Sequence, residues 1–279
     1  MGEAWFMSGR RSTFDDFFAR PIAELPIEAF GAFLFELTSG IHSFGDSDGE
    51  WSEWLGYCLP DLILRSHESD AFTPLIESTI AAFMNVYWSS ELPPIYPTFA
   101  TDIYSTLGRC LMKPELWIDR ATPRLGSMLG MRGGMSDALF WGRTSGDFSA
   151  AMFFALRYFP IDSLPRWIDS VLDIAHPAWR ARFVTWLWGA AALLRNPVAT
   201  IHDLERCKPP IEWDNSHCIG PAEGGSGPFI PTARSECALM HFRTRLESVL
   251  PHWSFDESPE IARVMSDLGA IDALFDALY

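Results

Sequence analysis

Residues 164–175 read Leu-Pro-Arg-Trp-Ile-Asp-Ser-Val-Leu-Asp-Ile-Ala, and this stretch decides the fold class. Its apolar side chains recur every three or four positions, which is the spacing of one face of an α-helix. The polar side chains between them fall on the opposite face: Arg166, Asp169, Ser170 and Asp173. The stretch therefore predicts a helix that is buried on one side and solvated on the other.

The two neighbouring segments predict helices of a different kind. Residues 148–159 and 177–195 are apolar on nearly all sides, and a helix without a polar face must be surrounded by other elements. The middle of the chain is therefore expected to stack as an inner, an outer and an inner helix.

Helical spacing recurs along most of the rest of the chain. It predicts further helices over residues 51–62, 75–87, 99–111, 232–250 and 270–278, and one that opens at Ser258-Pro259-Glu260. No stretch alternates with period two, so the predicted fold is all-α, with residues 1–279 as a single domain. Either a compact orthogonal bundle or an irregular α-solenoid of helix pairs, similar to HEAT or armadillo arrays, fits this pattern, although no repeat of about 34 to 47 residues is in register.

Two segments rich in Pro and Gly interrupt the pattern, at residues 113–135 and 207–231. Connections of about two dozen residues are uncommon inside a domain and are usually functional or disordered. If it is ordered, the second loop is a candidate contact surface.

The composition favours a soluble cytoplasmic protein. The chain has five scattered cysteines, an odd number, which is typical of reduced thiols in a cytosol. No targeting signal is visible, and no apolar run approaches the roughly 20 residues of a membrane span.

Negative charge dominates the chain, with a formal net charge of −15. Residues 1–100 carry 15 acidic and 4 basic side chains, whereas residues 101–200 carry 8 acidic and 11 basic ones. Such a surface repels nucleic acid and favours basic partners, although keeping an aromatic-rich protein soluble explains it as well. Some of the arginines are expected to form internal ion pairs.

The chemical motifs are weak. Asp15-Asp16-Phe17-Phe18 resembles the start of the aspartate-rich motif of terpene synthases, which implies a Mg²⁺-bound diphosphate site, but Ala19 stands where the third acid belongs. A helix cap with acids in its first turn explains the same residues. Arginines 120, 124, 132 and 143 surround a glycine-rich loop that lacks the Gly-Lys-Ser/Thr of a phosphate-binding loop, and internal pairing is the favoured interpretation.

Cysteine and histidine gather in the second loop and the helix after it. Cys237 and His241 are four positions apart, as zinc ligands on one helix face would be, and His202, Cys207, His217 and Cys218 precede them. There is no Cys-x-x-Cys pair, and Ser226 among its glycines lacks the strand and helix of a nucleophile elbow. We therefore expect no metal, no cofactor and no catalytic residue.

Residues 46–91 carry nine acids and a single base, Arg65, with tryptophans nearby. Aromatic anchors in an acidic field are typical of protein interfaces. The sequence therefore predicts a protein-binding scaffold for a basic partner, such as an immunity protein that neutralises a basic toxin or a regulatory adaptor. The expected binding residues are Asp46, Asp48, Glu50, Trp51, Glu53, Trp54, Asp61, Glu68 and Asp70. The alternative is an enzyme or carrier with an aromatic-lined cavity for a hydrophobic small molecule.

Overall fold

The fold was determined as a computed structural model, which describes residues 17, 19–44, 49–68, 74–117, 146–196, 204, 207, 211, 213, 216–220, 228–253, 266 and 269–279. Within these residues the chain forms nine α-helices and short 3-10 turns, and no strand. The prediction of an all-α array is confirmed.

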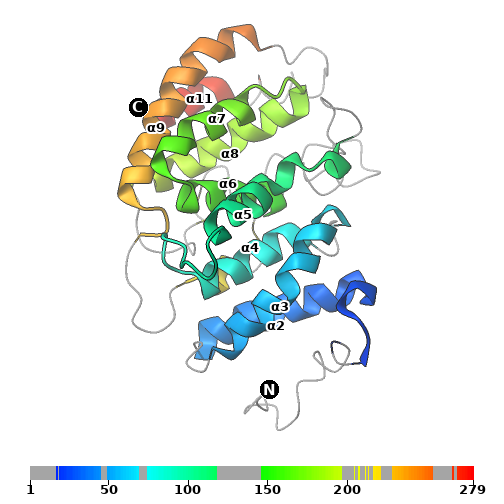
Figure 1. Ribbon diagram of the computed structural model, residues 1–279. Helices are drawn as coiled ribbons and strands as arrows, with labels where there is room; N and C mark the ends of the chain where they lie inside the picture. Colours follow the sequence, from blue (N-terminus) through cyan, green and yellow to red (C-terminus); the bar gives the residue numbers. More distant parts are fainter. Residues whose placement is uncertain are drawn as a thin grey trace.

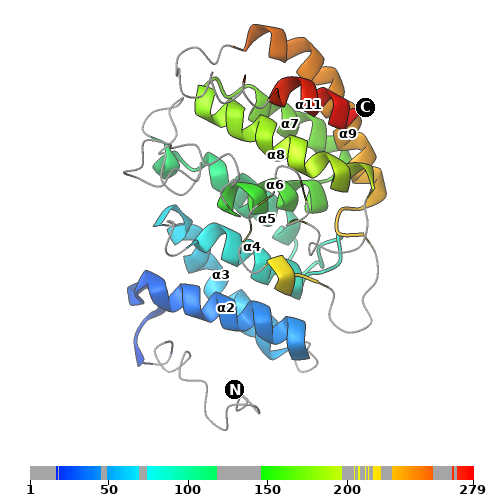
Figure 2. The ribbon, with the colours of Figure 1, turned by 180° about the vertical axis from the view of Figure 1, so that it is seen from behind.

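The helices are stacked in chain order (Figures 1 and 2). At one end of the stack lie α2 and α3, and at the other end lie α7, α8, α9 and α11. Alternate helices pack together, α2 on α4, α4 on α6, α7 on α9 and α8 on α11. Their bounds are α2 Ile27–Phe44, α3 Glu50–Arg65, α4 Leu75–Val86, α5 Phe99–Thr106, α6 Gly146–Tyr158, α7 Leu164–Leu172, α8 Pro177–Arg195, α9 Thr232–Val249 and α11 Ala270–Leu278.

The middle of the stack follows the predicted inner, outer and inner order. Every side chain of α6 from Asp147 to Tyr158 is buried, and so are most of those of α8. In α7 the apolar positions face inward, while Arg166, Ser170 and Asp173 are exposed. The helix ends at Leu172, three residues earlier than its apolar pattern.

Helix α4 differs from the expectation, because it is buried on almost all sides and not on one face alone. It lies between α2 and α6, which cover opposite sides of it. Pro74 supplies no side-chain cap at its start. Instead, the buried carboxylate of Asp147, from the first turn of α6, accepts a hydrogen bond of 2.9 Å from the Glu77 amide, so one helix caps the other.

Close contact between α2 and α3 depends on a glycine. A Cβ at Gly40 would lie 2.7 Å from the ring of Trp51, closer than real contacts allow. Trp51 is only 7% exposed and belongs to a cluster of buried apolar side chains that extends from Phe17 to Leu278. The α2–α3 end of the stack is thus joined to the rest through a continuous core.

Most of the described residues of the segment 207–231 pack inward, whereas His217 is exposed. Ile211, Trp213, Ile219, Phe229 and Ile230 are buried, and the ring of Trp213 stacks on that of Phe153. These residues therefore form part of the core and are not available as a contact surface. None of the described helices is both long and apolar enough to cross a membrane.

Candidate protein-binding surface

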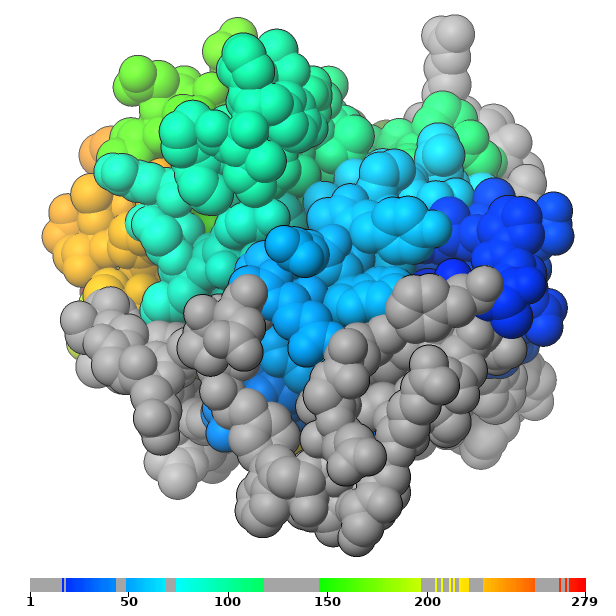
Figure 3. All heavy atoms as spheres, turned by 60° about the horizontal axis from the view of Figure 1, so that its bottom comes forward, coloured from blue at the N-terminus to red at the C-terminus, as the bar shows by residue number. Residues whose placement is uncertain are grey.

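The side of α3 that faces away from the core forms a surface of mixed apolar and acidic character. Burial of Trp51, Leu55, Cys58, Leu59 and Leu62 fixes the inner side of the helix. The opposite side, here called the α3 outer face, consists of Glu53, Gly56, Tyr57, Pro60, Asp61 and Leu64. In Figure 3 this part of the chain is the lighter blue surface beside the dark blue of the preceding residues.

Two large apolar side chains on this face are open to solvent. Tyr57 is 56% exposed and Leu64 is 68% exposed. They are seven positions apart, which is two helical turns, so they lie in one row along the helix. The edge of the Tyr57 ring is supported by Trp54, whose centroid lies 6.0 Å away. A tyrosine with one supported edge and an exposed face is a typical anchor for a partner protein.

Proline inside α3 leaves the backbone accessible in the same place. Pro60 has no N–H to donate to the carbonyl of Gly56, four positions earlier. Gly56 is exposed, and nothing lies within 4 Å of the point where its Cβ would be. A partner can therefore approach the backbone next to Tyr57.

The basic side chains around α3 are engaged elsewhere. Arg65 forms an ion pair of 2.8 Å with Glu68, donates a hydrogen bond of 2.6 Å to the carbonyl of Leu25, and lies over the ring of Phe30. Lys113 donates to the carbonyls of Ile63 and Leu64 at the end of the helix. These carbonyls give the end of α3 a partial negative charge, which favours a base at this position.

Within the described residues Glu53 and Asp61 lack a close basic partner, although the charge of Asp61 acts on Arg65, whose pKa is raised first by its hydrogen bond with Glu68 and also by Asp61. In the described part of the chain, no base lies within ion-pair distance of either carboxylate. Glu53 is exposed and Asp61 is half-buried, four positions either side of Tyr57. The field of Asp61 also reaches the thiol of Cys58, whose pKa is raised to about 12 by burial and by this carboxylate.

The predicted binding residues differ in exposure and in ion pairing. Glu53 and Asp61 lie on the α3 outer face, and Glu68 is exposed but paired with Arg65. Glu50 and Trp54 are half-buried, and Trp51 is buried in the α2–α3 contact, where its role is packing. Glu77, one of the nine acids, is buried as well. Asp46, Asp48 and Asp70 lie outside the described residues.

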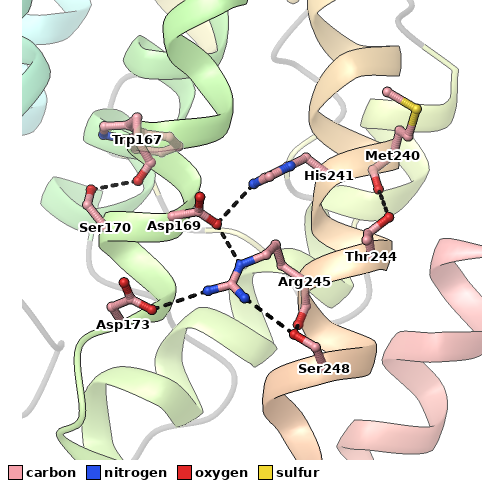
Figure 4. A network of polar contacts seen from close by, with 9 residues as sticks. All are labelled: Trp167, Asp169, Ser170, Asp173, Met240, His241, Thr244, Arg245 and Ser248. Carbon is pink, nitrogen blue, oxygen red and sulfur yellow. Dashed lines mark hydrogen bonds and ion pairs between the residues drawn. The ribbon is translucent and has the colours of Figure 1, made fainter.

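A second acidic helix face is neutralised. Asp169 of α7 accepts hydrogen bonds from His241 Nε2 at 3.0 Å and from Arg245 Nε at 2.6 Å, both from α9 (Figure 4). Arg245 also pairs with Asp173 at 3.3 Å and donates to the hydroxyl of Ser248. Partial burial raises the pKa of Asp169, but the hydrogen bonds from His241 and Arg245 outweigh it and hold this pKa below its ordinary 3.8.

This network also bears on the zinc hypothesis. His241, one of the two predicted ligands on α9, is hydrogen-bonded to Asp169. Burial raises the pKa of the other, the Cys237 thiol, with a further contribution from Asp162. No group of three or more metal-ligating side chains occurs among the described residues.

Buried arginines were the main features that the sequence interpretation missed. Arg157 and Arg182 lie on helices that are otherwise apolar, and both are at most 2% exposed. The signal was present, because a charged residue inside an all-apolar helix must be buried with partners. The loop arginines at 120, 124, 132 and 143, and Asp15, Asp16, His202 and Ser226, lie outside the described residues.

The described residues give the small-molecule alternative no support. A void between α6, α7 and the turn Leu107–Met112 has a volume of about 10 Å³, the space of one water molecule. Neither a family model, nor a curated protein, nor a solved structure matches the chain.

Proposed function

We propose that the chain is a protein-binding scaffold whose α3 outer face recognises a basic protein partner. The observation that carries this proposal is the state of Glu53 and Asp61, two carboxylates without a basic partner within the described residues, on either side of the exposed Tyr57. Glu53 lies in the first turn of α3, where the helix dipole favours a carboxylate, but a charge without an ion pair also attracts and orients a cationic partner.

The arrangement specifies the chemistry of the partner. An apolar row of Tyr57 and Leu64 needs aliphatic or aromatic side chains opposite it, and the flanking carboxylates need lysine or arginine beside them. An amphipathic helix with leucine in the centre and basic residues at the margins satisfies both requirements. A basic toxin held by its immunity protein, or the target of a regulatory adaptor, would present such a surface.

Acidity alone does not single out α3. Asp272 and Asp276 of α11 are also exposed and four positions apart, at the other end of the stack. Between them, however, Ala273 and Phe275 are half-buried and Leu274 is buried, so no exposed apolar anchor stands between the two carboxylates. This pair therefore provides a matched control that has the same charge without the anchor.

Selection from a library of helical peptides displayed on phage tests the proposal. We expect the wild-type protein to select peptides rich in lysine or arginine and leucine. These peptides should bind the Tyr57→Ala variant about thirtyfold more weakly, the typical effect of removing an anchor aromatic. They should bind the Asp272→Asn/Asp276→Asn variant as they bind the wild type. Selected peptides that are neutral or acidic, or that are indifferent to Tyr57, would refute the proposal.

A further inference from the structure

The connection between α4 and α5, whose course can be followed in Figure 1, carries an unusual concentration of exposed apolar residues. It reads Leu92-Pro93-Pro94-Ile95-Tyr96-Pro97, and every residue from Pro93 to Pro97 is exposed. Ile95 is 55% exposed and Tyr96 is 44% exposed. Surface connections are usually built from small polar residues, so this composition calls for a reason other than the turn itself.

Three prolines restrict the loop before any partner arrives. Each proline ring fixes its own φ, and each proline also biases the residue before it toward extended backbone. One hydrogen bond of 2.9 Å, from the Ile95 amide to the Pro93 carbonyl, bends the loop at Pro94. This bend differs from the extended polyproline conformation that proline-reading grooves bind, so the loop must give up this hydrogen bond for contacts with the partner, and a single exposed hydrogen bond contributes little net stability.

The base of the loop is fastened by buried side chains from α6. The guanidinium of Arg157 is 2% exposed, donates to the carbonyls of Trp88 and Phe229, and lies 4.1 Å from the centroid of the Trp88 ring. The hydroxyl of Tyr158 donates to the carbonyl of Tyr87 at 2.6 Å. These contacts fix the chain directly after α4.

A third side chain, from α9, holds the same segment. Arg234 donates to the carbonyl of Ser90 at 3.4 Å and to that of Phe159 at 2.9 Å. On the other side of the loop, the buried Phe99 begins α5, and its amide donates to the carbonyl of Tyr96. The exposed residues 93–97 are thus held at both ends, which lowers the entropy that a partner must remove on binding. The ring of Tyr96 packs on that of Phe99, with the centroids 5.3 Å apart, and this contact opens when a partner takes up the tyrosine.

We propose that residues 93–97 are a docking motif for a protein domain that reads proline-rich peptides through an aromatic groove, in the manner of a WW domain. Such a groove holds a proline pair between aromatic rings and takes a tyrosine two positions later in a neighbouring pocket, and Pro93, Pro94 and Tyr96 have this spacing. The interaction is independent of the α3 outer face, because it uses proline and aromatic contacts and no ion pair.

Titration of the intact protein with a purified WW domain that reads Pro-Pro-x-Tyr, followed by calorimetry, tests this proposal. We expect saturable binding that depends weakly on salt. Tyr96→Ala should weaken it about thirtyfold, as for an anchor tyrosine, and Pro94→Ala should weaken it about tenfold. Tyr279→Ala removes another exposed tyrosine, 65% exposed and outside the loop, and should leave the affinity unchanged.

Near-ultraviolet circular dichroism of each variant establishes that the loss reflects the motif and not unfolding. Absence of saturable binding at domain concentrations up to about 1 mM, the weak limit of specific recognition, would overturn the proposal. Equal affinity of wild type and Tyr96→Ala would overturn it too, as would binding of an SH3 domain alone, which would show that the spaced pair Pro94 and Pro97 is read instead.

Discussion

Two helix faces of this protein carry acids at helical spacing, and the structure treats them in opposite ways. On α7, Asp169 and Asp173 are matched by Arg245 and, for Asp169, by His241 from α9. On α3, Glu53 and Asp61 are matched by no base in the described part of the chain, and an exposed tyrosine stands between them. The first face holds two helices together, whereas we propose that the second binds another molecule.

This difference shows that acidity by itself does not mark a binding surface. The bases near α3 bind backbone carbonyls: Arg65 reaches Leu25, and Lys113 reaches Ile63. The deeper arginines Arg157 and Arg234 do the same. These positive charges tie loops and helix ends together, and among the exposed carboxylates near α3 only Glu68 forms an ion pair with one of them, Arg65, in the described part of the chain.

The largest expected effect is a difference in stability between substitutions on the buried side of α3 and on its outer face. Trp51→Ala removes a buried indole from the α2–α3 contact and should lower the free energy of unfolding by about 3 to 5 kcal/mol. Tyr57→Ala, on the outer side, should change it by less than about 0.5 kcal/mol. Urea unfolding of both variants measures the contrast. Similar losses for the two would mean that the outer face is part of the core.

Two glycine substitutions test the same difference between the buried α2–α3 contact and the α3 outer face. Gly40→Ala places a methyl group 2.7 Å from the Trp51 ring, so the ring or the helix must shift. We expect a loss of about 1 to 3 kcal/mol, as for other overpacked sites. Gly56→Ala, where the new methyl group meets open space, should be neutral or stabilising. Thermal unfolding of the pair checks this, and a tolerated Gly40→Ala would contradict the close contact.

The paired face should show a smaller, pH-dependent effect. Since the side chain of Asp169 is 37% exposed, solvent screening limits the loss from Asp169→Asn to about 1 kcal/mol at neutral pH. Its folded pKa lies below the ordinary 3.8, so this contribution is present above that value and is lost as the pH falls below it. Unfolding at neutral and acidic pH tests the sign. A difference between wild type and variant that grows in acid would contradict the network.

Neutralising the unpaired face should affect stability least. The double variant Glu53→Gln/Asp61→Asn removes no ion pair, so its free energy of unfolding should stay within about 0.5 kcal/mol of the wild type. Differential scanning calorimetry provides the comparison. A loss as large as that of Asp169→Asn would show that these two carboxylates have structural partners after all.

The sequence predicted the positions of the helices well, but it did not predict which charged side chains pair with one another. The all-apolar run at 177–195 and the helical spacing at 270–278 located α8 and α11 at the residues where they occur, because helices packed on a continuous core are built from such apolar positions. The helical spacing over 51–62 is confirmed in α3, with Trp54 only half-buried. The predicted range 75–87 agrees with α4 to within one residue, and Pro74 lies at its cap.

The pairing of charged side chains could not be predicted from local sequence patterns, because it depends on residues that are distant in the chain. Asp169 meets partners 72 and 76 positions away, and nothing near α7 in the chain indicates them. Glu77 was counted with the surface acids, although its neighbours Leu75 and Ile76 are apolar and α6 covers it. For the candidate site, sequence identified Glu53 and Asp61 but not the isolation of their charges, which only the folded arrangement of Arg65 and Lys113 reveals.

The most direct test of the central claim is the dissociation constant of a synthetic lysine–leucine amphipathic helix, measured over a range of salt concentrations. We expect Glu53→Gln/Asp61→Asn to weaken binding about tenfold at low salt, with a shallower salt dependence than the wild type. The control Asp272→Asn/Asp276→Asn changes the net charge equally and should bind as the wild type does. Equal weakening by both variants would mean that the peptide senses only the overall charge, and would contradict a binding site on the α3 outer face.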